Sequence, residues 1–329
     1  MKQILNYLFE NKAFSKDEAR DILTAISMGK YNNSQITAFM TAYCMRSITV
    51  NELEGFRDAM LDLCLPVDMG GMEMIDLCGT GGDGKDTFNI STLASFIVAG
   101  AGYKVAKHGN YGVSSGCGSS NVMEYLGYSF TNDIDALKKS ADKANICFLH
   151  APLFHPAMKT VAPIRRELGV KTFFNMLGPM VNPARPKNQL VGVYNLELAR
   201  MYAYLYQRSD RKYTILNALD GYDEVSLTCD FKTFSAEGEK IYTPESLGFT
   251  RLDPAEIAGG SNVPESAEIF TKILNGEGTT AQNNVVLVNA ALAIKTIKPL
   301  STFGDCFYEA EESLTGKKAL KSFRMLIQN

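Results

Sequence analysis

Five short apolar runs, separated by segments long enough to form helices, constrain the fold of this chain more than any other feature. The runs are MIDLCG (74–79), YKVAKHG (103–109), ICFLHA (146–151), QLVGVYN (189–195) and YTILNALDG (213–221). Such runs are typical of strands that are buried on both faces of a sheet. Helical patterns occupy STLASFIVAGAG (91–102) and NLELARMYAYLYQR (195–208). The alternation predicts an α/β fold with a mostly parallel central sheet.

The first 66 residues have a different pattern, with apolar residues at helical spacing. Helices are expected over SKDEARDILTAISMG (15–29), NSQITAFMTAYCMR (33–46) and TVNELEGFRDAMLDLC (49–64). Ser15 with Glu18, and Thr49 with Glu52, have the spacing of capping boxes. LPVDMGG (65–71) then marks a linker or domain edge. A small N-terminal helical domain is therefore expected.

Three later segments complete the expected secondary structure. Residues 155–184 have a helical, proline-punctuated pattern without a strand, so they could return to the N-terminal helices. Polar alternation over 231–248 favours an antiparallel edge hairpin. NNVVLVNAALAIKTI (283–297) and SLTGKKALKSFRMLI (313–327) are each expected to form one helix.

Composition excludes several classes of partner. With 33 basic and 36 acidic residues, the chain has no overall field that would attract nucleic acid or an anionic membrane. No apolar run approaches the roughly 18 residues of a membrane span, and the charged N-terminal stretch does not resemble a signal peptide, so a cytoplasmic protein is expected. The seven cysteines are scattered without a C-x-x-C pair, which predicts free thiols.

The strongest chemical signal is the glycine-rich loop within MIDLCGTGGDGKDTFNIST (74–92). Glycines leave backbone amides uncovered, and the helix that starts after the loop adds partial positive charge. This arrangement suits a phosphate or pyrophosphate. The spacing matches neither a Walker A loop nor the G-x-G-x-x-G fingerprint, and a purely structural turn is the alternative.

A second glycine-rich loop, KHGNYGVSSGCGSSNVME (107–124), follows the next predicted strand. Loops at the ends of neighbouring parallel strands face one crevice, where open α/β sheets bind ligands. Lys107 and His108 would contact an anion or a reacting group there, and Ser114, Ser115 and Ser119 offer hydroxyls. A hydrogen-bonded structural role is the alternative for His108.

Carboxylates form the third signal. Asp220, Asp223 and Glu224 follow a predicted strand in NALDGYDEVS (217–226). Adjacent carboxylates beside a phosphate site suggest Mg²⁺, whereas solvated surface acids are the alternative. His150 and His155 have no ligand spacing with a carboxylate, so no histidine-based metal site is expected.

An arginine pair is the fourth signal. Arg165 and Arg166 lie in IRRELG (164–169), and arginine binds carboxylate or phosphate groups through its planar fork. Surface arginines are the default alternative.

In this order, these elements resemble the anthranilate phosphoribosyltransferase family over nearly the whole chain. GTGGDGKDTFNIST is similar to the family's G-T-G-G-D loop and N-I-S-T helix start, and KHGN with the following serines is similar to its second loop. RRELG, FFNMLGPMVNP and DGYDEVS are similar to its R-x-x-L-G, N-x-L-G-P-x-x-N-P and D-G-x-D-E-[IV]-S segments.

The resemblance implies an enzyme of tryptophan biosynthesis. Such an enzyme transfers the 5-phosphoribosyl group from 5-phosphoribosyl-1-pyrophosphate to the amine of anthranilate and releases pyrophosphate. The implied fold is like that of nucleoside phosphorylases, with a helical domain of residues 1–66 plus about 157–182 and an α/β domain of about 72–156 plus 183–329. A homodimer formed through the helical domain is also implied.

The resemblance also implies the site residues. Phosphoribosyl pyrophosphate would be held by Gly79, Gly82, Asp83, Thr87, Asn89, Ile90, Ser91, Thr92, Lys107, Gly109, Asn110, Ser114, Ser115 and Ser119. Mg²⁺, expected as two ions, would be held by Ser91, Asp223 and Glu224, and anthranilate by Gly79, Asn110 and Arg165. The implied catalytic residues are Lys107, Arg165 and His108, the last only a candidate base beside water.

Five positions depart from the family pattern. Tyr111 and Gly112 stand where Arg-Ala is usual, Ser120 and Asn121 stand where Ala-Asp is usual, and Lys171 replaces a frequent arginine.

Two other readings are weaker. A pyrimidine nucleoside phosphorylase-like enzyme would carry a K-H-S-x-G-G-type loop, which this chain lacks. An inactive relative that binds nucleic acid is disfavoured by the intact acidic pair, Arg165, the G-T-G-G-D loop and the net charge of -3.

Overall fold

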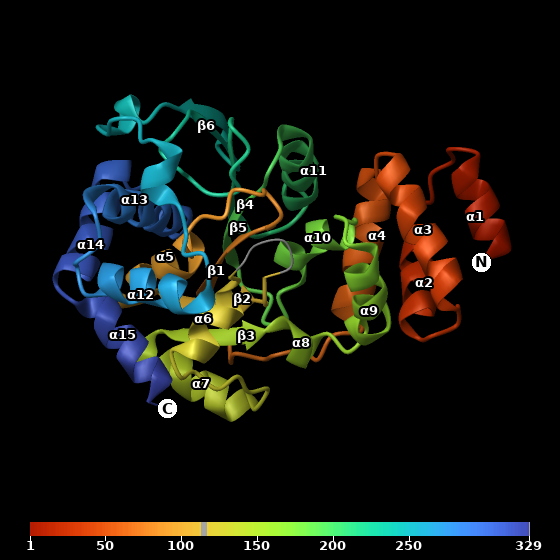
Figure 1. The fold of residues 1–329 in the computed structure, drawn as a ribbon, viewed down its shortest axis with the longest axis horizontal. Helices are drawn as coiled ribbons and strands as arrows, with labels where there is room; N and C mark the ends of the chain where they lie inside the picture. Colours follow the sequence, from red (N-terminus) through yellow and green to blue (C-terminus); the bar gives the residue numbers. More distant parts are fainter. Residues whose placement is uncertain (113–116, 329) are drawn as a thin grey trace. The chain divides into compact units, whose positions relative to one another are not determined.

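The computed structural model describes residues 1–112 and 117–328, and the chain divides into two compact units (Figure 1). Unit 1 consists of Met1–Val67 and Ala151–Arg185, and unit 2 of Asp68–His150 and Pro186–Asn329. We call Ala151–Arg185 the return segment, and it is a few residues longer at each end than the expected 157–182. It is held at both ends, because the Leu65 amide donates to the Phe154 carbonyl and Arg185 donates to the Leu61 carbonyl.

The regular elements of unit 1 are helices, joined by turns and loops. Its elements are α1 (Lys2–Phe9), α2 (Lys16–Ser27), α3 (Asn33–Met45), α4 (Val50–Asp62), α8 (Ala151–Phe154), α9 (Met158–Leu168), α10 (Phe174–Leu177) and the 3₁₀ turn η1 (Gly178–Val181). Both expected capping boxes are confirmed, at the starts of α2 and α4. The motifs did not single out α1, whose N-cap makes no side-chain hydrogen bond.

A buried carboxylate and an aromatic cluster organise unit 1. Glu52 is fully buried and accepts hydrogen bonds from the Arg46 guanidinium, the Tyr43 hydroxyl (2.9 Å) and the Phe14 amide (3.1 Å). Burial opposes its ionisation, but these donors lower the pKa of Glu52 below its ordinary value. Phe173 of the return segment stacks on Phe56 of α4 at 4.6 Å, which packs the segment against the first helices.

Unit 2 contains a seven-stranded sheet in the order β3-β2-β1-β4-β5-β6-β7. Its strands are β1 (Met74–Gly79), β2 (Lys104–Gly109), β3 (Ile146–His150), β4 (Asn188–Gly192), β5 (Lys212–Ala218), β6 (Phe231–Ser235) and β7 (Gly238–Tyr242). The first five pair in parallel, and β6 and β7 form the expected antiparallel edge hairpin. The predicted fold class is confirmed.

Helices cover the sheet. They are α5 (Ile90–Gly100), α6 (Ser119–Tyr125), α7 (Ile134–Ala144), α11 (Leu196–Tyr206), α12 (Val263–Leu274), α13 (Thr280–Ile297), α14 (Phe303–Thr315) and α15 (Lys318–Ile327), with 3₁₀ turns η2 (Glu245–Leu247) and η3 (Pro254–Ile257). In the view of Figure 1, α13 and α11 lie on opposite sides of β5, and both contact it. No helix among the described residues combines the length and apolar composition needed to cross a bilayer.

The expectation of a single helix over 313–327 is wrong. The chain breaks between α14 and α15, because Gly316 caps α14 and Lys317 adopts a left-handed φ of 59°. The break lets Ala319 and Leu320 pack into the core beside α5, where a Cβ on Gly100 would lie 2.4 Å from the Ala319 amide.

Replacing the fully buried Glu52 by alanine is expected to destabilise the protein by about 3–5 kcal/mol, because the largely covered Arg46 guanidinium would lose its counter-charge. Chemical denaturation followed by circular dichroism measures the change. Glu18→Ala is the matched control: Glu18 completes the same capping motif in α2 but is exposed. Equal losses for the two variants would contradict the role given to Glu52.

Candidate functional site

The candidate site lies at the carboxyl ends of β1 and β4, where the order of the strands reverses. The chain adds β2 and β3 on one side of β1, and β4 and β5 on its other side. Gly79 at the end of β1 pairs with Gly192 at the end of β4. In open α/β sheets such a switch point forms the crevice that receives ligands.

The first glycine-rich loop leaves β1 at this point and leads to α5. Gly81, Gly82 and Gly84 have φ values of 67°, 78° and 73°, a region that strongly favours glycine. The Thr80 amide donates to the Gly192 carbonyl at 3.0 Å, which fixes the loop to β4. The loop therefore has the backbone conformation and the attachment that an anion cradle requires.

Asp223 lies against both strand ends. A Cβ on Gly79 would lie 2.4 Å from Asp223 Oδ2, and a Cβ on Gly192 would lie 1.5 Å from the Asp223 carbonyl oxygen. The same Oδ2 accepts the Gly81 amide at 2.5 Å. Both strands must therefore end in glycine for the acidic segment to reach the first loop.

Glu224 lies beside the start of α5. Its Oε1 accepts the Ser91 amide at 2.8 Å. Burial raises the pKa of Asp223, and the neighbouring charge of Asp83 raises it further. Burial also raises the pKa of Glu224, and the charge of Asp223 adds to the effect. Two adjacent carboxyl groups that resist ionisation would be stabilised in their charged form by a bound cation.

The oxygen atoms of these side chains suit a cation that is coordinated partly by the protein and partly by a bound ligand. A cavity of about 10 Å³, roughly the size of one water, is lined in part by the polar residues Ser91, Asp223, Glu224 and Asn289. Among the described residues, no group of three or more histidine, cysteine or acidic side chains is placed to hold a metal by itself. Mg²⁺ prefers oxygen donors and usually keeps waters and substrate phosphates, so this donor set suits Mg²⁺.

Lys107 is nearly fully buried, with 2% of its side chain exposed. Its ammonium donates to the Leu77 carbonyl of β1 and approaches the Ser91 hydroxyl at 3.4 Å. Because the Ser91 amide binds Glu224, the ammonium and the carboxylate meet at the same residue of α5. A positive charge is therefore fixed beneath the helix start.

The second loop continues from β2. The Asn110 carbonyl accepts the Ser120 amide (3.1 Å) and the Ser119 hydroxyl (3.3 Å), which ties the end of β2 to α6. His108 is nearly buried, and its backbone amide donates to Asp76 at 3.1 Å. The expected residues Ser114 and Ser115 lie outside the described residues.

The two loops are joined by a side chain that was expected to contact ligand. Asn89 Nδ2 donates to the Cys117 carbonyl at 3.2 Å, so in this structure Asn89 links the start of α5 to the second loop. Thr87 forms a bridge with Ala258. The other expected residues lie in the first loop, at the end of β2 or in the first turn of α5: Gly82, Asp83, Ile90, Thr92 and Gly109.

Arg165 belongs to unit 1, where it lies in α9. It donates to Asn175 at 3.3 Å, packs over the Phe174 ring at 5.4 Å, and burial lowers its pKa. Arg166 is exposed. The contacts orient one guanidinium of the pair and leave the other in solvent.

Asn289 is a supporting residue that no motif indicated. From the middle of the apolar helix α13, its side chain accepts the Val225 amide (3.1 Å) and donates to the Val225 carbonyl (2.9 Å). Val225 directly follows Glu224, so Asn289 fixes the acidic segment. The one available signal is a polar residue inside an apolar helical run, VVLVNAAL.

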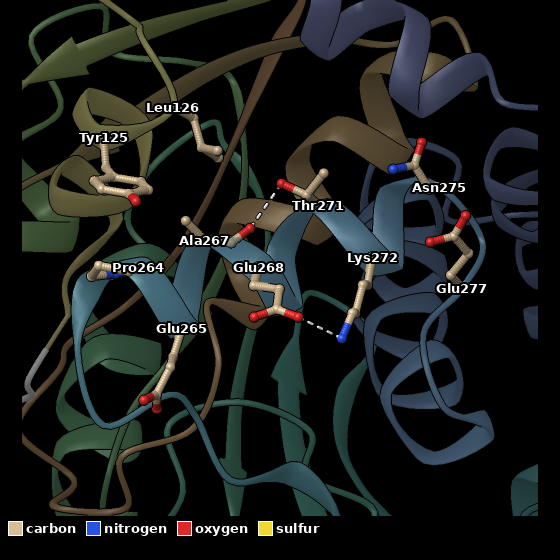
Figure 2. Close-up of a pocket in the computed structure, with 10 residues that line it drawn as sticks. All are labelled: Tyr125, Leu126, Pro264, Glu265, Ala267, Glu268, Thr271, Lys272, Asn275 and Glu277. Carbon is tan, nitrogen blue, oxygen red and sulfur yellow. Dashed lines mark hydrogen bonds and ion pairs between the residues drawn. The ribbon is translucent and has the colours of Figure 1, made fainter.

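A larger groove lies elsewhere in unit 2, between α6 and α12 (Figure 2). Its volume is about 510 Å³, and its charged lining consists of Glu265, Glu268, Glu277 and Lys272. It contains none of the residues expected in the site. Three glutamates with one lysine also make it a poor match for a phosphorylated ligand.

Comparison with known proteins identifies the family. Residues 2–64 match the helical bundle domain, and residues 71–320 the a/b domain, of a glycosyl transferase family. Anthranilate phosphoribosyltransferase of Christiangramia forsetii is 61% identical over 99% of this chain and 98% of its own length. The enzyme of the same name from Bacteroides thetaiotaomicron is 53% identical over 100% of this chain and 99% of its own.

Solved structures agree with this assignment. Anthranilate phosphoribosyltransferase of Thermus thermophilus superposes with a TM-score of 0.91 at 28% identity, covering 99% of this chain and 98% of its own. The Saccharomyces cerevisiae enzyme in complex with phosphoribosyl pyrophosphate and Mg superposes with a TM-score of 0.90 at 26% identity, covering 99% and 97%. The chain therefore belongs to the anthranilate phosphoribosyltransferase family.

Proposed function

We propose that this protein transfers the 5-phosphoribosyl group from 5-phosphoribosyl-1-pyrophosphate to the amine of anthranilate. The bond from C1 of the ribose to the pyrophosphate oxygen breaks, a bond from C1 to the amine nitrogen forms, and pyrophosphate and a proton leave. One observation carries the proposal. Asp223 binds the first loop, while Glu224 and the buried Lys107 both contact Ser91 at the start of α5, and the chain belongs to this family.

The first and second loops would bind the phosphoribosyl pyrophosphate. Uncovered amides of the first loop and the first turn of α5 would donate to phosphate oxygens. Ser119 and Asn110 would contribute from the second loop, as the family resemblance implies. As the C1–oxygen bond lengthens, negative charge grows on pyrophosphate, and the fixed charge of Lys107 would stabilise it beside Ser91.

Asp223 and Glu224, with the Ser91 hydroxyl, would hold Mg²⁺ on the pyrophosphate. The metal would supply positive charge to the leaving group. In its absence the two carboxyl groups keep raised pKa values, so binding it would require them to lose protons.

Anthranilate would be held by its carboxylate on Arg165, which its contacts to Asn175 and Phe174 orient in advance. Gly79 and Asn110 are the other proposed contacts. Either His108 or water would accept the proton that the amine loses. We further propose a cytoplasmic homodimer formed through unit 1, as the resemblance implies.

The decisive assay mixes purified protein with anthranilate, phosphoribosyl pyrophosphate and Mg²⁺ and follows the loss of anthranilate fluorescence. The expected result is a loss that stops when EDTA removes the metal and resumes when Mg²⁺ is restored. Fluorescence that stays constant with all components present would refute the proposed reaction.

Replacing Lys107 by alanine is expected to lower kcat on the order of 10²- to 10³-fold and to change KM for phosphoribosyl pyrophosphate much less, because its charge acts on the leaving group in the transition state. Steady-state kinetics measure both constants. Lys104→Ala is the control, because Lys104 lies half-buried at the start of the same strand, where it pairs with Asp142. A rise in KM alone would show that Lys107 only binds substrate.

Arg165→Ala is expected to raise KM for anthranilate by about 10-fold or more, because the arginine would bind the carboxylate of this substrate. The KM for phosphoribosyl pyrophosphate should stay near its original value. Arg166→Ala, the exposed neighbour, serves as the matched control. If both KM values rose equally, the assignment of Arg165 to anthranilate would be wrong.

Asp223→Asn is expected to make the metal-free protein more stable than the original at high pH. This gain in the free energy of unfolding should be larger at pH 8.5 than at pH 5 by about 1 kcal/mol or more. The pKa of Asp223 is higher in the folded protein than in the unfolded chain. The original protein therefore has its full stability below the ordinary carboxyl pKa and becomes less stable as the pH rises through the raised pKa, whereas an asparagine does not titrate. Denaturation in EDTA at the two pH values measures the effect. Asp220→Asn, hydrogen-bonded to Thr228 instead, controls for loss of a carboxylate in the same segment. A gain for Asp223→Asn that did not depend on pH would contradict this explanation.

A further inference from the structure

Four of the five positions at which this chain departs from the family pattern lie close together around the second loop. They are Tyr111, Gly112, Ser120 and Asn121, and their contacts include Glu124 of α6 and His150 of β3. We call Tyr111, Ser120, Asn121, Glu124 and His150 the Tyr111 cluster. It joins the end of β2, the start of α6 and the end of β3.

Tyr111 bridges two elements. Its ring lies edge-on to the His150 ring at 4.8 Å, with an interplanar angle of 77°. Its hydroxyl donates to the Glu124 carboxylate, at 3.2 Å to Oε1 and 3.4 Å to Oε2. The Tyr111 side chain thus connects the chain next to Asn110 to both β3 and α6.

The His150 imidazole, against which Tyr111 packs, is itself held in place. His150 is 5% exposed, its Nδ1 lies 2.9 Å from the hydroxyl of the fully buried Ser120, and Phe130 stacks on its ring at 4.3 Å. Because Ser120 and Phe130 hold the imidazole from two directions, Tyr111 packs against a surface that cannot easily move.

Asn121 brings the two ends of the loop to one oxygen atom. Its Oδ1 accepts both the Gly112 amide (2.9 Å) and the Gly118 amide (3.0 Å). A Cβ on Gly118 would lie 2.1 Å from the Gly112 nitrogen, so the two backbones are in direct contact. Asn121 therefore joins Gly112 to Gly118, and Tyr111 holds the chain beside Asn110.

We propose that Tyr111 is a positioning residue which, through His150 and Glu124, holds the two described ends of the second loop, 110–112 and 117–121, in the geometry that presents Asn110 and Ser119 to the phosphoribosyl group. The inference rests on the function proposed above. The Asn110 side chain accepts the Tyr111 amide at 2.8 Å, and its carbonyl accepts the Ser119 hydroxyl. A displacement of Tyr111 is therefore transmitted to both proposed ligand contacts.

The test compares steady-state kinetics of Tyr111→Ala and Tyr111→Phe. The alanine variant is expected to lower kcat/KM for phosphoribosyl pyrophosphate on the order of 10- to 100-fold, since small displacements of positioned groups are costly. The KM for anthranilate should change much less, because Gly79 and Arg165 would still contact that substrate, and the melting temperature should stay near that of the original protein. The phenylalanine variant keeps the ring on His150 and loses only the bond to Glu124, so about a 3-fold effect is expected.

Tyr125→Ala is the matched control. Tyr125 is the last residue of α6 and is 58% exposed. It lines the groove beside α12 instead of contacting the second loop (Figure 2). The proposal is overturned if Tyr111→Ala behaves as Tyr125→Ala does, or if the KM for anthranilate changes more than kcat/KM for phosphoribosyl pyrophosphate.

A double-mutant cycle with Ser120→Ala tests the route through His150. Because both side chains act on the same imidazole, the two losses in kcat/KM should not multiply independently. Independent effects would overturn the route. Hydrogen exchange of peptides covering 107–125 gives a readout that needs no activity: exchange should be faster in Tyr111→Ala than in Tyr125→Ala. An inactive original protein would refute the proposed function, whereas unchanged exchange would refute the positioning role.

Discussion

The contact between Asp223 and the two strand-end glycines, Gly79 and Gly192, is the constraint on which the rest of the site depends. A methyl group at either glycine would overlap Asp223, at 2.4 Å from its carboxylate or 1.5 Å from its carbonyl. With glycine at both ends, the acidic segment crosses the carboxyl edge of the sheet at the switch point. There it meets the first loop through the Gly81 amide and α5 through the Ser91 amide.

The acidic pair destabilises the metal-free protein. Two buried, adjacent carboxyl groups with raised pKa values are unfavourable in the metal-free protein, and they persist because neighbouring groups fix them. Asn289 holds Val225 through both backbone groups, and Lys107 places a positive charge below Ser91. A cation and a phosphorylated ligand would complete the electrostatics of such a site.

Much of the fold was predictable because it is encoded locally. All five buried strands, the edge hairpin and the capping boxes of α2 and α4 follow from patterns a few residues long. The break at Gly316–Lys317 has a local signal in Gly316, which the helical pattern on both sides outweighed, whereas the positive φ of Lys317 has none. Likewise α1 has no capping side chain to mark its start.

The sequence by itself determined the kinds of group available: glycines after two strands, an acidic pair, a lysine at the end of the second strand and an arginine pair. Only the tertiary structure decided which of them meet. Gly81 and Asp223 are 142 residues apart, and Ser91 and Glu224 are 133 apart. Their contact depends on β4 pairing beside β1. The same holds for Tyr111, whose partner His150 lies on a separate strand. Strand order is set by the packing of whole crossovers against one another, and no local pattern records it.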